Sequence, residues 1–187
     1  NGTYTINCTA VIVATGGFGA NSDMVVEYNP ELAGFGTTNV AAATGDGIAM
    51  GTAIGAATVD MEQIQTHPTV HPETQTMYTE AVRGNGAIIV NKEGARFTNE
   101  MGTRDVVSAA ILEQTDGQAW LVFDHAVCTS LKAIEGYISA GIVTEAETIE
   151  ELATKIGADQ LALSFYRSFN LPVWHFFCNF AMYEIHS

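Results

Sequence analysis

Three arginines that lie close together in the sequence are the first candidates for chemistry. Arg83, Arg96 and Arg104 fall within one stretch of 22 residues, positions 83 to 104. The whole chain has 7 Lys and Arg against 21 Asp and Glu, a formal charge of −14, so this basic group opposes the overall field. Guanidinium groups bind carboxylates and phosphates well. The grouping therefore indicates a site for an anionic small molecule.

An acidic residue and flexible backbone accompany these arginines. Glu80 and Arg83 are three residues apart in TEAVRGNG, a spacing that allows an ion pair across one helical turn. Gly84 permits close approach of the backbone to a ligand. The same spacing is typical of an ordinary solvated ion pair, and Arg104 beside Asp105 indicates, by itself, a surface salt bridge. Spacing alone leaves both interpretations open.

Two glycine loops near the start of the chain are candidates for a nucleotide site. The apolar run TAVIVA leads into ATGGFGAN, and a second loop reads ATGDGIAM. Glycines at a helix N-terminus can cradle a diphosphate. The first loop lacks the full GxGxxG fingerprint, because Ser22 stands at the position of the third glycine. Each loop alone is compatible with a tight turn, whereas the two together favour a cofactor site.

Two histidines four residues apart do not indicate a metal site. His67 and His71 would share one face of a helix, but Pro68 and Pro72 follow them directly and exclude a continuous helix. The 3 cysteines are widely spaced and form no CxxC pair, so neither zinc nor a disulfide framework is predicted. We therefore expect no metal site.

The first part of the chain must position the glycine loops, and its pattern is that of an α/β unit. Residues 9–14 predict a buried parallel strand that feeds the first loop. Asn21 or one of the two residues after it can cap a helix that stops at Asn29 and Pro30. Asp46 can cap a second helix after the second loop. Strand, glycine turn and helix are thus expected to alternate.

After residue 59 the pattern changes, and the two His-Pro dipeptides mark a domain boundary. Residues 86–99 have the composition of a β-hairpin around a Lys-Glu-Gly turn. Thr103 can cap a helix that reaches Gln114 and turns Val106 and other apolar residues inward. Arg96 is therefore expected on a hairpin and Arg104 at a helix start.

The remaining segments complete an α+β pattern. Residues 120–123 predict a buried strand. Thr148 and Glu151 have capping-box spacing for a helix that ends near Gly157. The second part of the chain thus differs in class from the first.

Composition excludes several classes of protein. The 187 residues are 47% hydrophobic and 15% charged, which is typical of a folded globular chain. The strong negative charge disfavours binding to nucleic acid or to anionic lipid. No apolar run approaches the ~20 residues that span a bilayer, so we expect a soluble protein with no transmembrane segment.

Six segments, in their order and spacing, resemble the middle of the flavoprotein subunit of soluble fumarate reductases. These proteins belong to the wider succinate dehydrogenase and fumarate reductase flavoprotein family. The resemblance covers roughly residues 9–157 and rests on AVIVATGGFGAN, ATGDGIAMGTAIGAA, EQIQTHPTV, TEAVRGNGAIIVN, GARFTNEMGTRDVVSAAIL and AWLVFD.

The resemblance implies a fold and a cofactor. It implies an α/β remnant of a Rossmann-like FAD-binding domain over residues 1–61, followed by part of an α+β capping domain over residues 62–187. Within the second unit, residues 161–187 no longer resemble the family and are of uncertain assignment. The implied flavin contacts form an incomplete FAD site, and they are Thr15, Gly16, Gly17, Gly45 and Asp46.

The resemblance also implies the reduction of fumarate to succinate. His67 and Thr79 would hold a substrate carboxylate, with the Glu80 backbone nearby and Met77 close to the substrate double bond. Arg104 would donate the proton that follows hydride transfer from flavin N5. Glu80 and Arg83 would form the relay that reprotonates Arg104.

Two other functions remain open at the level of sequence. The chain could belong to a reductase of another α,β-unsaturated acid, such as urocanate or an acrylate derivative, although His67 favours a dicarboxylate. It could also be a catalytically silent capping-domain fragment, and we expect the isolated chain to be inactive. The electron donor, the cellular compartment and any haem or FMN module cannot be read from these residues.

Overall fold

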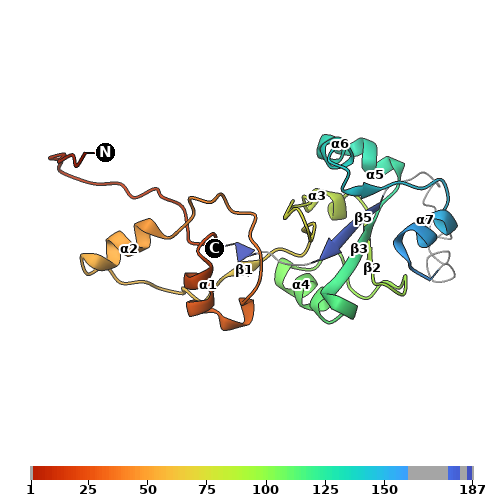
Figure 1. The fold of residues 1–187 in the computed structure, drawn as a ribbon, viewed down its shortest axis with the longest axis horizontal. Coiled ribbons are helices and arrows are strands. Elements are labelled where there is room, and N and C mark those ends of the chain that lie inside the picture. Colours follow the sequence, from red (N-terminus) through yellow and green to blue (C-terminus); the bar gives the residue numbers. More distant parts are fainter. Residues whose placement is uncertain (1, 160–176, 182–184, 187) are drawn as a thin grey trace.

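The computed structural model describes residues 2–159, 177–181 and 185–186. Figure 1 shows two regions along the chain. The first contains helices α1 (Ser22–Tyr28) and α2 (Asp46–Ala53), which are joined by a short 3-10 helix, η1 (Pro30–Leu32), and irregular segments. The second contains a four-stranded sheet with helices packed around it. The protein is a mixed α/β structure.

The predicted strand over residues 9–14 is not formed, so this expectation was wrong. These residues are irregular and exposed, with Val11 77% and Ile12 92% accessible. A strand needs a neighbouring strand to satisfy its backbone N–H and C=O groups. None of the described residues pairs with this segment, and the α/β alternation expected for the first region is therefore reduced to its helices and loops.

The two helices of the first region begin where turn chemistry allows. Asn21 is the N-cap of α1 as predicted, since its side-chain oxygen accepts the N–H of Met24 at 3.1 Å. The expectation for Asp46 was wrong by one position. Gly45 is the N-cap of α2, and its positive φ of 83° places Asp46 as the first helical residue. Only glycine adopts that backbone conformation without strain.

The second region is organised by an antiparallel sheet with the order β2-β3-β5-β4. Its strands are β2 (Ile88–Val90), β3 (Gln118–Val122), β5 (Phe177–Ala181) and β4 (Val143–Thr144). The register pairs Ile89 with Leu121, and Leu121 in turn with Cys178. A separate two-stranded ladder joins β1 (Gln65–Thr66) to β6 (Ile185–His186). Part of the tail that lost the family resemblance therefore enters both sheets.

Alternation along the strands gives the sheet two buried faces. On one face, Ile89 and Leu121 pack with residues of four helices. These helices are α3 (Ala81–Gly84), α4 (Arg104–Leu112), α5 (His125–Ser130) and α6 (Lys132–Ser139). On the other face, Val90 and Val122 pack against Leu152 of α7 (Ile149–Ile156). The sheet is therefore a rigid layer between helices.

The hairpin that carries Arg96 and the helix that carries Arg104 are formed as predicted, but the helix ends at Leu112 rather than at Gln114, and Thr103 makes no side-chain capping hydrogen bond. Asn91 donates its N–H to the carbonyl of Ala95 at 3.0 Å, and Val90 forms a bridge with Arg96. Helix α4 begins after Thr103 as expected. Val106, however, is 56% exposed rather than inward. The buried face of α4 is set by Val107 and the residue four positions later, and Val106 falls to its side.

The last described helix confirms the cap at Thr148 but forms only one half of the predicted capping box. Thr148 accepts the N–H of Glu151 at 3.0 Å, and Gly157 ends α7 with a φ of 70°. The Glu151 side chain reaches back to the N–H of Glu147 rather than to that of Thr148. The described helices have at most 9 residues, and none of them is long and apolar enough to cross a membrane.

Candidate functional site

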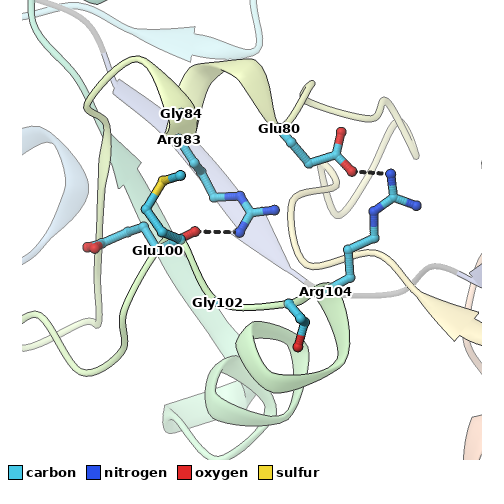
Figure 2. Close-up of a pocket in the computed structure, with 8 residues that line it drawn as sticks. Glu80, Arg83, Gly84, Glu100, Gly102 and Arg104 are labelled. Atoms are coloured by element: carbon cyan, nitrogen blue, oxygen red, sulfur yellow. Dashed lines mark hydrogen bonds and ion pairs between the residues drawn. The ribbon is translucent and has the colours of Figure 1, made fainter.

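A hollow of about 240 Å³ lies between the N-termini of α3 and α4 (Figure 2). Glu80 is the residue before α3, and Arg104 is the first residue of α4. The hollow is lined by Glu80, Arg83, Gly84, Glu100, Met101, Gly102, Thr103 and Arg104. The structure therefore brings together the three residues expected to move protons, namely Glu80, Arg83 and Arg104.

The Glu80 carboxylate is the centre of this group. Its Oε1 forms an ion pair with the Arg104 guanidinium and lies 3.1 Å from Nε2 of His67. His67 is fully buried, and its Nδ1 accepts the N–H of Thr69 at 3.3 Å. A neutral imidazole that accepts at Nδ1 carries its proton on Nε2. The Nε2 of His67 therefore faces the Glu80 carboxylate at contact distance, without the alignment of a hydrogen bond.

Arg104 is held from two directions. Its guanidinium meets Glu80 on one side and donates to the side-chain oxygen of Gln65 on the other. A cation at a helix N-terminus is disfavoured by the helix dipole, and a nearby carboxylate offsets this. The Arg104 side chain is 38% exposed, so it is fixed in place and yet reachable by a small molecule.

The charge state of Glu80 follows from its neighbours. Burial by itself raises the pKa of Glu80, but a backbone hydrogen bond and the adjacent His67 and Arg104 side chains outweigh it and lower that pKa. Glu80 is therefore an ionised carboxylate near neutral pH. An ionised carboxylate between a guanidinium and an imidazole can accept a proton and pass it on.

Arg83 lies in the wall of the hollow and does not pair with Glu80, contrary to the spacing argument. Its Nη1 donates to the backbone carbonyl of Glu100 at 2.7 Å (Figure 2). Arg83 is 6% exposed, and its Nε has no hydrogen-bond partner among the described residues. Burial is the largest cause that lowers the pKa of this guanidinium, and the charge of Arg104 adds to it.

Two residues that hold the arginines in place, Gln65 and Glu100, were not predicted from the sequence. Gln65 contacts Arg104 from β1, and no local signal in the sequence indicates that contact. Glu100 binds Arg96 through both carboxylate oxygens, at 2.9 and 2.6 Å. The four-residue spacing of Arg96 and Glu100 could have indicated this pair. Arg96 is thus occupied by Glu100 and does not line the hollow.

The predicted substrate contacts other than Glu80 lie beside the hollow rather than in its lining. Thr79 donates its backbone N–H to the hydroxyl of Tyr137 at 3.1 Å, and its own hydroxyl accepts from Ala81 at 3.4 Å. Met77 is 39% exposed and forms a bridge with Val70. The roles expected for Thr79, Met77 and His67 therefore stay predictions.

The two glycine loops of the first region lie together. Gly45 donates its N–H to the carbonyl of Gly17 at 3.1 Å, and Asn21 donates its side-chain N–H to the carbonyl of Thr44 at 3.0 Å. A side chain on Gly47 would overlap the hydroxyl of Thr15. All five expected flavin contacts thus belong to one paired-loop unit.

This unit has the chemistry of a nucleotide cradle. Thr15, Gly16 and Asp46 are exposed, and Gly16 has a positive φ of 77°. The backbone N–H groups at the start of α2 can meet an anion, and the Asp46 carboxylate can accept a hydroxyl or an N–H. Within the described residues, no group of three or more His, Cys, Asp or Glu side chains is arranged to hold a metal ion.

Comparisons with known proteins agree with these features. Residues 1–178 match the model of the FAD binding domain family. The chain is 53% identical over 154 residues to the NADH:fumarate oxidoreductase of Klebsiella pneumoniae (strain 342), covering 82% of this chain and 17% of that protein. It is 47% identical over 163 residues to the fumarate reductase (cytochrome) of Shewanella frigidimarina, covering 87% of this chain and 28% of that protein.

A comparison with solved structures also finds a fumarate reductase. The open conformation of a flavocytochrome c3 fumarate reductase superposes with a TM-score of 0.75 at 33% identity, covering 92% of this chain and 34% of that chain. The chain thus spans less than a third of the length of these two curated relatives. It belongs to the FAD binding domain family, and the resemblance to fumarate reductase flavoproteins that its motifs indicated is confirmed.

Proposed function

We propose that this chain is part of an FAD-dependent flavoprotein that reduces fumarate to succinate. The ion pair between Arg104 and Glu80, at the rim of a hollow that Arg83 also lines, is the observation that carries this proposal. It offers one guanidinium that a small dicarboxylate can reach and a carboxylate beside it that can handle protons. The names of the relatives support the choice of fumarate.

The proposal includes the division of the chain. Residues 1–61 form the C-terminal part of a Rossmann-like FAD-binding domain, and residues 62–187 form part of a capping domain that closes over the flavin. The paired glycine loops support the first assignment. The separate apolar clusters around Phe18 and around Leu121 support the division.

FAD fits the paired loops. Thr15, Gly16 and Asp46 would hold it, because they are exposed and can meet phosphates and hydroxyls. Gly17 and Gly45, which are hydrogen-bonded to each other, would shape the loops around it. When bound and reduced, FAD supplies the hydride that reaches one alkene carbon of fumarate. The exposed apolar residues of segment 9–14 would pack against further parts of the same domain.

The residues of this chain then supply the proton. Arg104 donates a guanidinium proton to the second alkene carbon, where negative charge develops as the first carbon receives the hydride. The arginine guanidinium is a very weak acid, so it serves only against a strongly basic carbanion. The substrate carboxylates would be oriented by His67 and Thr79, with Met77 near the double bond.

Glu80 and Arg83 restore the proton. After each turnover the neutral guanidine of Arg104 takes a proton through Glu80, with which it is paired. Arg83 has a pKa lowered mainly by burial, so it gives up a proton more readily than an exposed arginine. The hollow that both residues line would admit water to replace the proton.

The test is substrate-dependent oxidation of a reduced viologen dye by the full-length flavoprotein that carries this chain. Fumarate, urocanate and acrylate are compared in parallel, and the flavin absorbance verifies FAD loading. We expect rapid turnover with fumarate alone. Turnover with another enoate instead would keep the fold and overturn the substrate. No turnover with any of them in flavin-loaded protein would overturn the reductase function.

A further inference from the structure

We infer that Glu100 is a positioning residue, which holds Arg83 in the wall of the hollow through its backbone carbonyl. This inference rests on the proposed function, in which Arg83 belongs to the proton relay. Glu100 precedes Arg104 by four residues and is 5% exposed. The side-chain carboxylate and the backbone carbonyl of Glu100 have different partners. The carboxylate anchors the residue, and the carbonyl orients Arg83.

The carboxylate end of Glu100 is clamped. Arg96 donates from Nε to Oε1 at 2.9 Å and from Nη2 to Oε2 at 2.6 Å. The backbone N–H of Ile89 in β2 donates to Oε1 at 2.9 Å. Charge-assisted, bidentate bonds of this kind fix both position and orientation. Glu100 is therefore tied to the edge of the sheet.

The carbonyl end of Glu100 faces the hollow. It accepts Nη1 of Arg83 at 2.7 Å, whereas the carboxylate of the same residue points away from Arg83 (Figure 2). This is the one hydrogen bond of the Arg83 guanidinium within the described residues, and the Nε of Arg83 is buried without a partner. The orientation of Arg83 therefore depends on where Glu100 is held.

The substitution Glu100→Gln tests whether the bonds of the Glu100 carboxylate control the orientation of Arg83. In Glu100→Gln the amide oxygen can still accept from Ile89, but the amide NH₂ then faces the Nη2 donor of Arg96. Two donors repel each other, so the bond from Nη2 of Arg96 and the charge of the clamp are lost, while the bond from Nε to the amide oxygen and the size of the side chain are kept. The carbonyl of Glu100 then loses its fixed position, and Arg83 loses its orientation.

The experiment is a double-mutant cycle on fumarate turnover of the full-length flavoprotein. Glu100→Gln is expected to lower kcat about tenfold with little change in KM. The same substitution in an Arg83→Ala background is expected to change kcat less than about twofold, because the residue through which Glu100 acts is gone. Glu113→Gln, which removes an exposed carboxylate at the end of α4, is the matched control and should leave kcat unchanged.

Two results would overturn the inference. One is an unchanged kcat in Glu100→Gln, and the other is an equal loss of kcat with and without Arg83. If Glu100→Gln does not fold, Arg96→Lys takes its place in the cycle, because lysine keeps the charge but cannot form the fork.

Melting temperatures distinguish a failure of this inference from a failure of the proposed function. If the wild-type protein does not reduce fumarate, the proposed function fails, and the same cycle is read from melting temperatures. Non-additive shifts for Glu100→Gln and Arg83→Ala would still support the positioning role. Additive shifts would contradict it.

Discussion

Glu80 and Arg104 form an ion pair that joins the start of α3 to the start of α4. The two side chains are 35% and 38% exposed, so the pair is partly screened by water and adds little to stability. It instead keeps a guanidinium at the N-terminus of a helix, where the dipole disfavours it. This small contribution to stability agrees with the proposed role of the pair in proton transfer.

The charge of Glu80 predicts how stability depends on pH. The pKa of Glu80 is lowered from its ordinary value of 4.5 in the folded protein. The contribution to stability is therefore fully present above pH 4.5 and is lost as the pH falls through the lower, folded-state pKa. Glu80→Gln should lower the free energy of unfolding at pH 7 by at most about 1 kcal/mol, and the difference should vanish in acid.

Urea unfolding of both proteins at several pH values measures this effect. His67 and Arg104 are the charged or titratable neighbours that lower the pKa of Glu80. A difference in unfolding free energy that stays constant from neutral to acidic pH would show that Glu80 stabilises the protein by packing rather than by charge.

Tyr137 should support the segment that carries Thr79 and Glu80. Its hydroxyl accepts the backbone N–H of Thr79 at 3.1 Å, and its ring lies edge-on to that of Tyr78. Tyr137→Phe removes only the hydroxyl and should lower the free energy of unfolding by about 1 kcal/mol. It should also raise KM for fumarate, because the backbone beside the expected carboxylate contact is released.

Tyr4→Phe is the control for Tyr137→Phe, since Tyr4 is 88% exposed. Chemical denaturation and steady-state kinetics are measured on both variants. Equal stability and equal KM in the two variants would exclude a supporting role for the Tyr137 hydroxyl.

Replacing a glycine of the paired loops by alanine should destabilise the protein by an amount that depends on the position. A Cβ on Gly45 would lie 2.7 Å from the sulfur of Met24, and the residue also has a φ of 83°. Gly16 has a φ of 77° but open space around it. Gly45→Ala should therefore cost about 1–3 kcal/mol and reduce bound FAD, whereas Gly16→Ala should cost about 1 kcal/mol from backbone strain alone.

Gly2→Ala, at a position with neither restriction, supplies the baseline for this series. Thermal unfolding and the ratio of flavin to protein are the measurements. Gly16→Ala proving more disruptive to stability than Gly45→Ala would contradict the described packing of the two loops.

Local features were predictable from the sequence because their partners lie only a few residues away. The caps at Asn21 and Thr148 and the turn at Gly157 each depend on contacts within one or two turns. The hairpin that leads from β2 was predictable for the same reason. Short-range hydrogen bonding decides such features before any tertiary packing.

Long-range features were not predictable in this way. The segment 9–14 has the composition of a buried strand, but a strand is formed only where another strand pairs with it. The spacing of Glu80 and Arg83 suggested an ion pair, yet Glu80 pairs with Arg104 from a different helix. Tertiary packing thus overrode the local preference, and it also placed Gln65 beside Arg104.

In the proposed function, Arg104 donates the proton that completes the reaction, so substitution of Arg104 tests that function. Fumarate-dependent oxidation of reduced viologen is measured for the full-length flavoprotein and for its Arg104→Ala and Arg104→Lys variants, with flavin content checked by absorbance. We predict that kcat falls at least about 10²-fold in the alanine variant while FAD stays bound. Near-normal turnover in flavin-loaded Arg104→Ala would contradict it.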